Sequence, residues 1–117
     1  MQDANAPMWH VTLTMAGDQR DPDVVRASLE RLADERPFLL TARYSADRAE
    51  LRYWEQAGEL EDAAALALRL WGEHRTSADL PPWRVTGLEV VDRVTYQRRA
   101  AQTSAGSLVA AGAVTPF

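Results

Sequence analysis

Two arginines, a tryptophan and a histidine are the side chains of this sequence whose chemistry points most directly to a functional site. Arg43 and Arg52 lie on either side of the polar stretch SADRA, and Trp54 follows shortly after Arg52. Arginine forms paired hydrogen bonds with carboxylates and phosphates, and arginine with tryptophan is typical of interface centres. His10 lies in a threonine-rich segment, where an imidazole can act as a general base. These residues indicate anion binding, protein binding or proton transfer.

The composition excludes several kinds of chemistry. The chain has no cysteine, and all of its 13 basic residues are arginine. Disulfides, thiolate nucleophiles, cysteine-bound metals and lysine Schiff bases are therefore excluded. The sequence contains no glycine-rich phosphate loop and no cluster of histidines and carboxylates, so we expect no cofactor and no metal. The net charge of −4 is spread along the chain without basic blocks, so we expect no nucleic-acid partner.

The length and hydropathy predict one soluble domain. The chain has 117 residues, of which 46% are hydrophobic, and this is enough for a single core. No apolar run approaches the roughly 18 residues that a membrane helix requires, so we expect no membrane partner. The N-terminus lacks the basic and apolar regions of a signal peptide, which predicts a cytoplasmic location. The exclusive use of arginine and the absence of isoleucine indicate a high-GC bacterium as the source.

Hydrophobic periodicity predicts six elements. Four segments alternate between apolar and polar residues, as half-buried strands do, and two have apolar residues at helical spacing. Asp21 is a suitable N-cap for the first helix, and Pro37 is expected to end it. The predicted strands are residues 8–16, 38–45, 49–56 and 83–99, and the predicted helices are residues 22–36 and 60–75.

The order strand, helix, strand, strand, helix, strand predicts a ferredoxin-like α+β fold. In this fold a four-stranded antiparallel sheet carries two helices on one face, with the first and third strands in the middle. We expect an N-terminal extension over residues 1–7 and a single domain over residues 8–99. Residues 100–117 are small, uncharged and aperiodic, so we expect a flexible C-terminal tail.

Strand alternation places a mixed set of polar and aromatic side chains on the sheet face away from the helices. Matching the apolar sides of the predicted hairpin puts Arg43 opposite Arg52 and Thr41 opposite Trp54. Like charges that face each other are unfavourable unless a carboxylate or an external anion lies between them. The predicted ligand or interface residues are Arg43, Arg52, Trp54, His10, Thr12, Thr41 and Glu89.

Two interpretations of this face remain open. The arginines either form a solvated surface with nearby glutamates such as Glu50, or they belong to a binding surface. On the second interpretation, the protein is a small non-enzymatic binding or interaction domain. We expect such a domain to be a homodimer and to use its uncovered sheet face to bind an anionic small molecule or a protein partner.

A resemblance supports an enzyme as the alternative. Trp54, His10, Arg43 and Arg52 resemble the pocket of cofactor-independent monooxygenases of the dimeric α+β barrel type, which line the uncovered sheet face with Trp, His, Arg and Tyr. The resemblance implies that His10 is the catalytic proton-transfer group. A closed cavity containing His10 and Trp54 favours the enzyme, whereas a flat or protein-filled face favours the binding domain.

Overall fold

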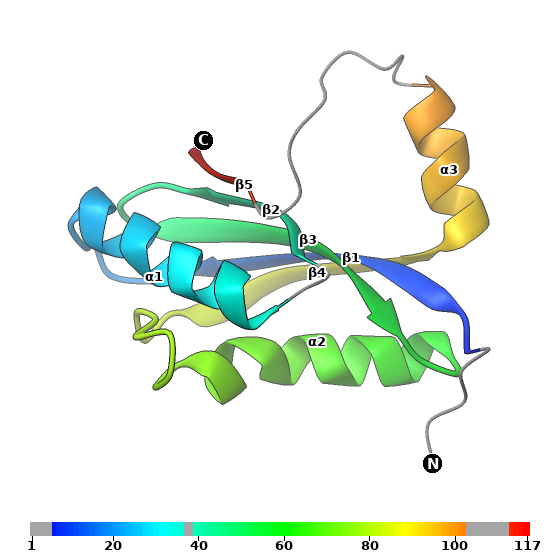
Figure 1. Cartoon of the computed structure of the whole chain (residues 1–117), viewed down its shortest axis with the longest axis horizontal. Helices are drawn as coiled ribbons and strands as arrows, with labels where there is room; N and C mark the ends of the chain where they lie inside the picture. The colour runs from blue at the N-terminus through cyan, green and yellow to red at the C-terminus, as the bar shows by residue number, and fades with distance from the viewer. Residues whose placement is uncertain (1–5, 37–38, 103–112) are drawn as a thin grey trace.

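The computed structural model describes residues 6–36, 39–102 and 113–117. These residues form an α+β fold with three helices and five strands (Figure 1). Parts of the predicted N-terminal extension, second strand and tail lie outside the described residues. In chain order the elements are β1 (Met8–Ala16), α1 (Pro22–Glu35), β2 (Leu39–Tyr44), β3 (Arg48–Gln56), α2 (Leu60–His74), β4 (Arg84–Asp92), α3 (Arg93–Gln102) and β5 (Ala113–Pro116).

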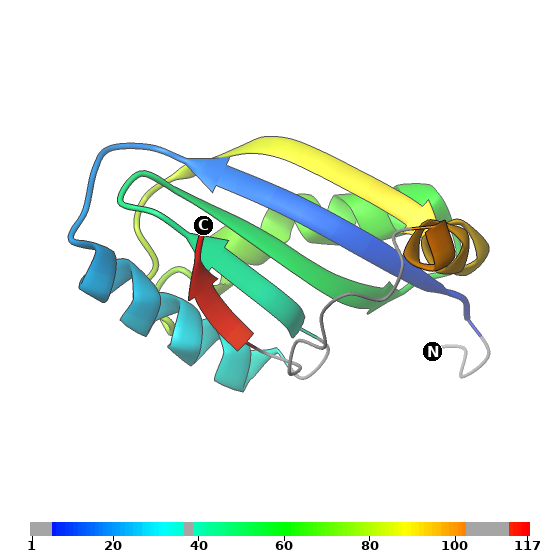
Figure 2. The same cartoon turned by 90° about the horizontal axis from the view of Figure 1, so that it is seen from above.

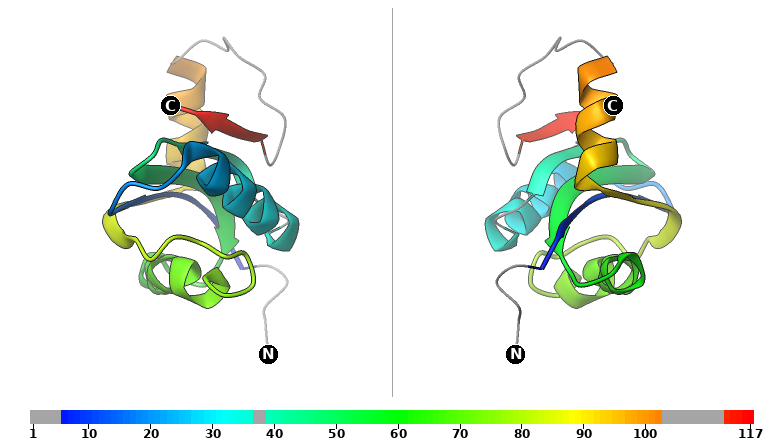
Figure 3. Two further views of the ribbon diagram at one scale, coloured as in Figure 1. Left: turned by 90° about the vertical axis from the view of Figure 1, so that its left-hand side faces the viewer. Right: turned by 90° about the vertical axis from the view of Figure 1, so that its right-hand side faces the viewer.

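The strands form one mixed sheet in the order β4-β1-β3-β2-β5. The pairs β1–β3, β1–β4 and β2–β3 are antiparallel, and β5 is parallel to β2. The helices α1 and α2 cover one face of the sheet, and α3 projects from the other (Figures 1 and 3). The sheet therefore has one face that is buried by helices and one that is largely free of them.

The predicted four-stranded antiparallel sheet with two helices is wrong. The fifth strand, β5, comes from residues predicted to belong to the tail, and it joins the sheet because Val114 packs against the core. The predicted last strand, residues 83–99, ends at Asp92 and is followed directly by a third helix. The Asp92 carboxylate accepts a hydrogen bond from the Thr95 backbone N–H at 2.7 Å, which caps α3.

The core lies between the sheet and the helices α1 and α2. Alternate residues of the central strands point into it, because side chains alternate between the two faces of a strand. On α1 the Asp21 side chain accepts the Asp23 backbone N–H at 2.9 Å, so the helix begins where the sequence predicts. Core side chains with no exposed surface include Val11, Leu13, Met15, Val25, Leu29, Leu32, Leu51 and Tyr53.

The hairpin between β2 and β3 is tighter than predicted. The Ser45 backbone N–H donates a hydrogen bond to the Arg48 carbonyl at 2.9 Å, so β3 begins inside the stretch that the sequence indicates as the loop. As a result, Arg43 lies opposite Glu50, and the predicted opposition of Arg43 and Arg52 is wrong. A shift of register by two residues moves each side chain along the strand but leaves it on the same face.

The same register places Thr41 opposite Arg52, and not opposite Trp54 as predicted. Trp54 instead has its cross-strand neighbour on β1, where it pairs with His10. The strand-to-strand neighbours of the predicted site residues therefore differ from the expected ones, although the residues share one face.

Candidate functional site

The sheet face opposite α1 and α2, called the open face below, carries the residues that the sequence singles out. Four of them form a row across the sheet: Thr12 on β1 pairs with Glu89 on β4 and with Arg52 on β3, and Arg52 pairs in turn with Thr41 on β2. His10 and Trp54 pair with each other in the next row, and Arg43 lies in the row on the opposite side. The predicted site residues thus lie on adjacent strands.

One end of the open face holds three aromatic rings, called the aromatic cluster below: His10, Trp54 and Tyr96. Tyr96 comes from α3 and stacks on His10, with ring centroids 4.3 Å apart and planes 27° apart. Its centroid lies 4.8 Å from that of Trp54, at 75° between the planes. His10 and Trp54 meet edge to face at 5.3 Å. Offset-stacked and edge-to-face contacts are the favoured arrangements of such rings.

The imidazole of His10 is buried within the aromatic cluster, with only 5% of its surface exposed. Burial is the main cause that lowers its pKa from 6.5 to about 4, and the nearby positive charge of Arg52 lowers it further. Arg99 acts in the same direction, whereas Glu89 opposes the shift. His10 is therefore uncharged at neutral pH and is a weaker base than an ordinary histidine.

Tyr96 was not predicted as a site residue, because the segment around it continues the alternating pattern of β4. The signal that indicates a helix is Asp92, a good N-cap residue, together with the helix-favouring run from Gln97 to Gln102. None of the side chains of α3 is buried. Besides Tyr96, an ion pair holds the helix to the sheet, in which Arg99 Nη1 lies 2.8 Å from Glu89 Oε1.

The other end of the open face holds two arginines around one phenylalanine, called the arginine pair below: Arg43 and Arg48. Their guanidinium carbons lie 5.0 Å and 5.1 Å from the centroid of the Phe117 ring. The Phe117 backbone N–H donates to the Tyr44 carbonyl at 2.9 Å, which places the ring beside β2. Figure 2 shows that α3 and the C-terminus lie toward opposite ends of the sheet.

Neither member of the arginine pair forms an ion pair with a carboxylate within the described part of the chain. Both side chains belong to exposed residues. Neither Arg48 nor Phe117 is among the predicted ligand or interface residues. Arg48 has the same strand parity as Arg52 and could have been found from it, whereas Phe117 reaches the site only because β5 pairs with β2.

Arg52 differs from the arginine pair because it has a carboxylate partner. Its Nε lies 3.2 Å from Glu50 Oε1 on the same strand, and half of the Arg52 side chain is exposed. Such surface ion pairs contribute about 0–1 kcal/mol. For Arg52, the interpretation as a solvated surface residue with a glutamate partner therefore agrees with the structure.

A serine, a glutamate and a histidine meet on the opposite side of the molecule, but they are not arranged for nucleophilic catalysis. Ser77 Oγ donates to Glu35 Oε1 at 2.6 Å, and His74 Nδ1 lies 2.6 Å from the same oxygen. These two hydrogen bonds lower the pKa of Glu35, with Ser77 the larger cause. No hydrogen bond joins the Ser77 and His74 side chains within the described residues, so this cluster ties the ends of α1 and α2 together.

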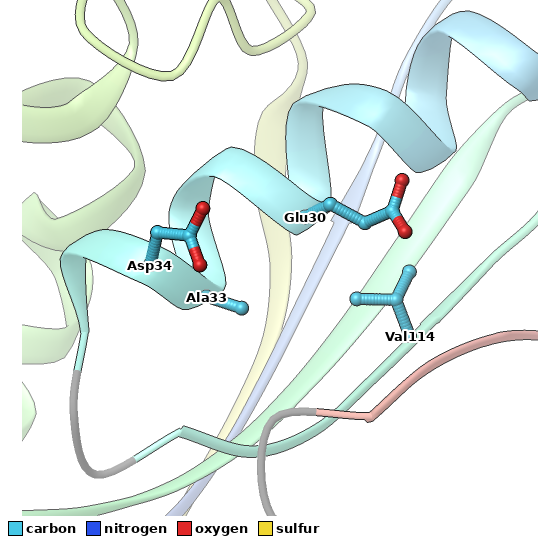
Figure 4. Close-up of a pocket in the computed structure, with 4 residues that line it drawn as sticks. All are labelled: Glu30, Ala33, Asp34 and Val114. Carbon is cyan, nitrogen blue, oxygen red and sulfur yellow. The ribbon is translucent and has the colours of Figure 1, made fainter.

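An open groove of about 340 Å³ lies between α1 and β5 (Figure 4). Glu30, Ala33 and Asp34 of α1 line one side, and Val114 of β5 lines the other. Both acidic residues are exposed, and water therefore solvates their carboxylates. None of the predicted site residues lines this groove.

The described residues contain neither a cluster of metal-binding side chains nor a helix that could cross a membrane. Within residues 6–36, 39–102 and 113–117, no three histidine, aspartate or glutamate side chains are grouped so that they could hold a metal ion. In the same residues, none of the helices combines the length and apolar character that crossing a membrane requires.

Comparison with known proteins gives one family. A search of curated proteins found no match to the chain. The model of the family described as "Domain of unknown function (DUF8830)" matches residues 8–107, a stretch that begins with β1 and includes α3. Because this match covers most of the sequence, the chain belongs to the DUF8830 family.

Proposed function

We propose that the protein is a non-enzymatic binding domain that uses its open face to bind an anionic group. The observation that carries this proposal is the arginine pair: Arg43 and Arg48 lie about one ring, and neither forms an ion pair with a carboxylate of the described residues. Two exposed cations that share a site without a counter-charge repel each other. An external anion between them removes this repulsion.

The chemistry of the arginine pair suits a carboxylate or a phosphate. A guanidinium presents several N–H donors in a planar fork, which matches the two oxygens of such groups. The Phe117 ring lies within the distance at which a cation is attracted to an aromatic face, so it restricts the two guanidinium groups before a ligand arrives. Restricting a side chain in advance lowers the entropic cost of binding.

The aromatic cluster is evidence against the monooxygenase-like alternative. Tyr96 fills the space over His10, so the face at this point is filled by protein. The lowered pKa of His10 also makes it a poor acceptor for a substrate proton. Both observations favour a binding domain, in which His10 contributes packing.

The interaction partner and cellular setting of this binding domain are predicted from the sequence only. Homodimer formation through the open face, a cytoplasmic location and a bacterial source stay predictions. Light scattering coupled to size exclusion measures the mass in solution and tests the first of them. A protein partner with an exposed acidic group would use the same arginine pair as a small anion.

Isothermal titration with citrate and with inorganic phosphate, in a buffer of low ionic strength, tests the anion site. We expect saturable binding to the wild type and a loss of at least about tenfold in the double variant Arg43→Gln/Arg48→Gln, because charged hydrogen bonds are lost. The matched control is Arg26→Gln/Arg75→Gln, which removes the same charge from exposed positions on the helical layer.

The control separates a site from a general charge effect. Affinity that falls equally in both double variants shows that only net charge matters, and this result contradicts the proposal. Absence of saturable binding of either anion to the wild type contradicts it as well. Retained cooperative unfolding of both double variants, checked by circular dichroism, shows that a loss of binding is not a loss of fold.

A further inference from the structure

The ring of Tyr96 lies in a corner that two other rings of the open face form by themselves. His10 and Trp54 are neighbours on the central strands β1 and β3, and their planes meet at 78°. Tyr96 stacks on the first ring and meets the second edge to face. The corner thus offers a planar ring both of the arrangements that aromatic rings favour.

The helix that delivers Tyr96 is weakly attached to the rest of the molecule. It has 10 residues and no buried side chain. A helix of this length is marginally stable in water without tertiary contacts. Figure 3 shows that α3 stands away from the sheet, and its main contacts are with the neighbouring strands β1 and β4, while Tyr96 also reaches Trp54 on β3. Tyr96 can therefore leave the corner at a small cost in free energy.

Trp54 has spare hydrogen-bonding capacity that the other tryptophans lack. The indole N–H groups of Trp9, Trp71 and Trp83 each donate to a backbone carbonyl at 2.9 Å. The indole of Trp54 forms no hydrogen bond with the described residues. Buried indoles normally have such a partner. The Trp54 ring is therefore better suited to a surface that binds a ligand.

The two arginines whose charges act on His10 each have a carboxylate partner. Arg52 is paired with Glu50 at 3.2 Å, and Arg99 is paired with Glu89 at 2.8 Å. In this respect Arg52 and Arg99 differ from the arginine pair. The present occupant of the corner is a neutral phenol. The corner therefore matches an uncharged aromatic ring better than a charged ligand.

We propose that His10 and Trp54 form a binding site for an uncharged planar ring of the size of phenol, and that Tyr96 occupies this site as an internal stand-in for the ligand. This site is separate from the proposed anion site, because it uses different residues at the other end of the face. α3 acts as a lid that competes with the ligand. The apparent affinity is then reduced by the fraction of molecules in which the lid is closed.

Titration of the full chain with p-cresol, which is the side chain of tyrosine as a free molecule, tests this proposal. Removing the competing ring in Tyr96→Ala is expected to raise the affinity by at least about tenfold over the wild type. The matched control is Val94→Ala, which shortens an exposed side chain on the same helix and is expected to bind p-cresol as the wild type does. Isothermal titration measures each affinity.

A second probe distinguishes recognition of an aromatic ring from nonspecific binding in an apolar cavity. 4-Methylcyclohexanol resembles p-cresol in size and polarity but is not planar and has no π system. We expect it to bind Tyr96→Ala at least about tenfold more weakly than p-cresol does. Equal affinity for the two probes shows a simple apolar cavity and overturns the proposal, as does an unchanged p-cresol affinity across the wild type and both variants.

The position of the ligand is read from the indole resonances in a ¹H–¹⁵N spectrum. The Trp54 signal, assigned with Trp54→Phe, is expected to move on addition of p-cresol while those of the other tryptophans stay in place. Movement of any other indole signal instead of Trp54 contradicts the proposal. If Tyr96→Ala does not fold, Arg99→Gln is used in its place, because this change weakens the contact of α3 with Glu89 and leaves the three rings unchanged. An affinity for p-cresol equal to that of the wild type in Arg99→Gln then contradicts the proposal.

Discussion

The two faces of this sheet hold their aromatic residues in different ways. On the face covered by α1 and α2, Trp71 and Trp83 stack with their planes 4° apart, and both donate their indole N–H groups to backbone carbonyls. On the open face, Trp54 is only partly buried and forms no such bond within the described residues. The covered face therefore satisfies both of these indole N–H groups internally, as is usual for buried polar groups. The open face leaves groups available to another molecule.

The charges on the open face are divided in a comparable way. Beside the aromatic cluster, Arg52 and Arg99 each have a glutamate partner, whereas the arginine pair at the other end has none among the described residues. The two ends of the open face therefore differ in the pairing of their charged side chains, although both belong to the same sheet. The covered face, in contrast, holds the buried core.

The largest difference in the free energy of unfolding is expected between substitutions of two neighbouring residues of β3. Leu51 has no exposed surface, whereas the next residue, Arg52, is exposed on the open face. Leu51→Ala is expected to lower the free energy of unfolding by about 2–5 kcal/mol, because it leaves a cavity in the core. Arg52→Ala is expected to change it by less than about 1 kcal/mol. Urea unfolding of the two variants measures the difference; similar losses would show that the open face also carries the fold.

A smaller effect is expected from the titration of His10. Its pKa is 6.5 when unfolded and about 4 when folded, so between these values the unfolded chain binds more protons. Stability is therefore highest above pH 6.5 and falls as the pH is lowered toward 4, by at most about 3 kcal/mol. Other groups titrate in this range, so the measurement is the difference between the wild type and His10→Phe in urea unfolding at pH 7 and pH 4.

The variant His10→Phe keeps a ring in the aromatic cluster but cannot be protonated. It is expected to lose less stability on acidification than the wild type does. An equal loss in the two proteins would mean that the imidazole is already solvated in the folded state and that Tyr96 does not seal it.

The smallest effect concerns the one polar atom on the covered face that is left without a partner. The hydroxyl of Tyr53 is buried and forms no hydrogen bond within the described part of the chain. Burial raises the pKa of this phenol, and Glu55 adds to the rise. Tyr53→Phe is expected to raise the free energy of unfolding by about 1 kcal/mol, because an unsatisfied buried hydroxyl is removed and the ring is kept. A loss of stability in urea unfolding would reveal a partner for the hydroxyl.

Much of the layer arrangement could be predicted from the sequence. The alternation in β1 and β3 correctly separates core residues such as Leu13 and Tyr53 from open-face residues such as Thr12 and Arg52. The start of α1 at Asp21 was also predictable. These features depend on the spacing of residues close together in the chain, because a strand repeats every two residues and a helix every 3.6.

The partners of the site residues could not be predicted in the same way. Arg43 lies opposite Glu50 because a tight turn between Ser45 and Arg48 sets the register, and hydrophobic matching is equally good at the expected register. The alternating pattern of β4 continues beyond Asp92, but the strand ends there because the Asp92 side chain caps α3. This helix brings Tyr96 to His10.

Local periodicity in the sequence is enough to assign most strand residues to a face of the sheet; an exception is Leu39, which is buried although alternation groups it with Thr41 and Arg43, because the register shifts between Leu39 and Thr41. The pairing of the arginines, the ring that covers His10 and the contact of Phe117 with Arg43 and Arg48 depend on the tertiary structure. Those contacts join segments that are distant in the chain, and the register and strand order that bring them together are fixed by hydrogen bonds across the sheet.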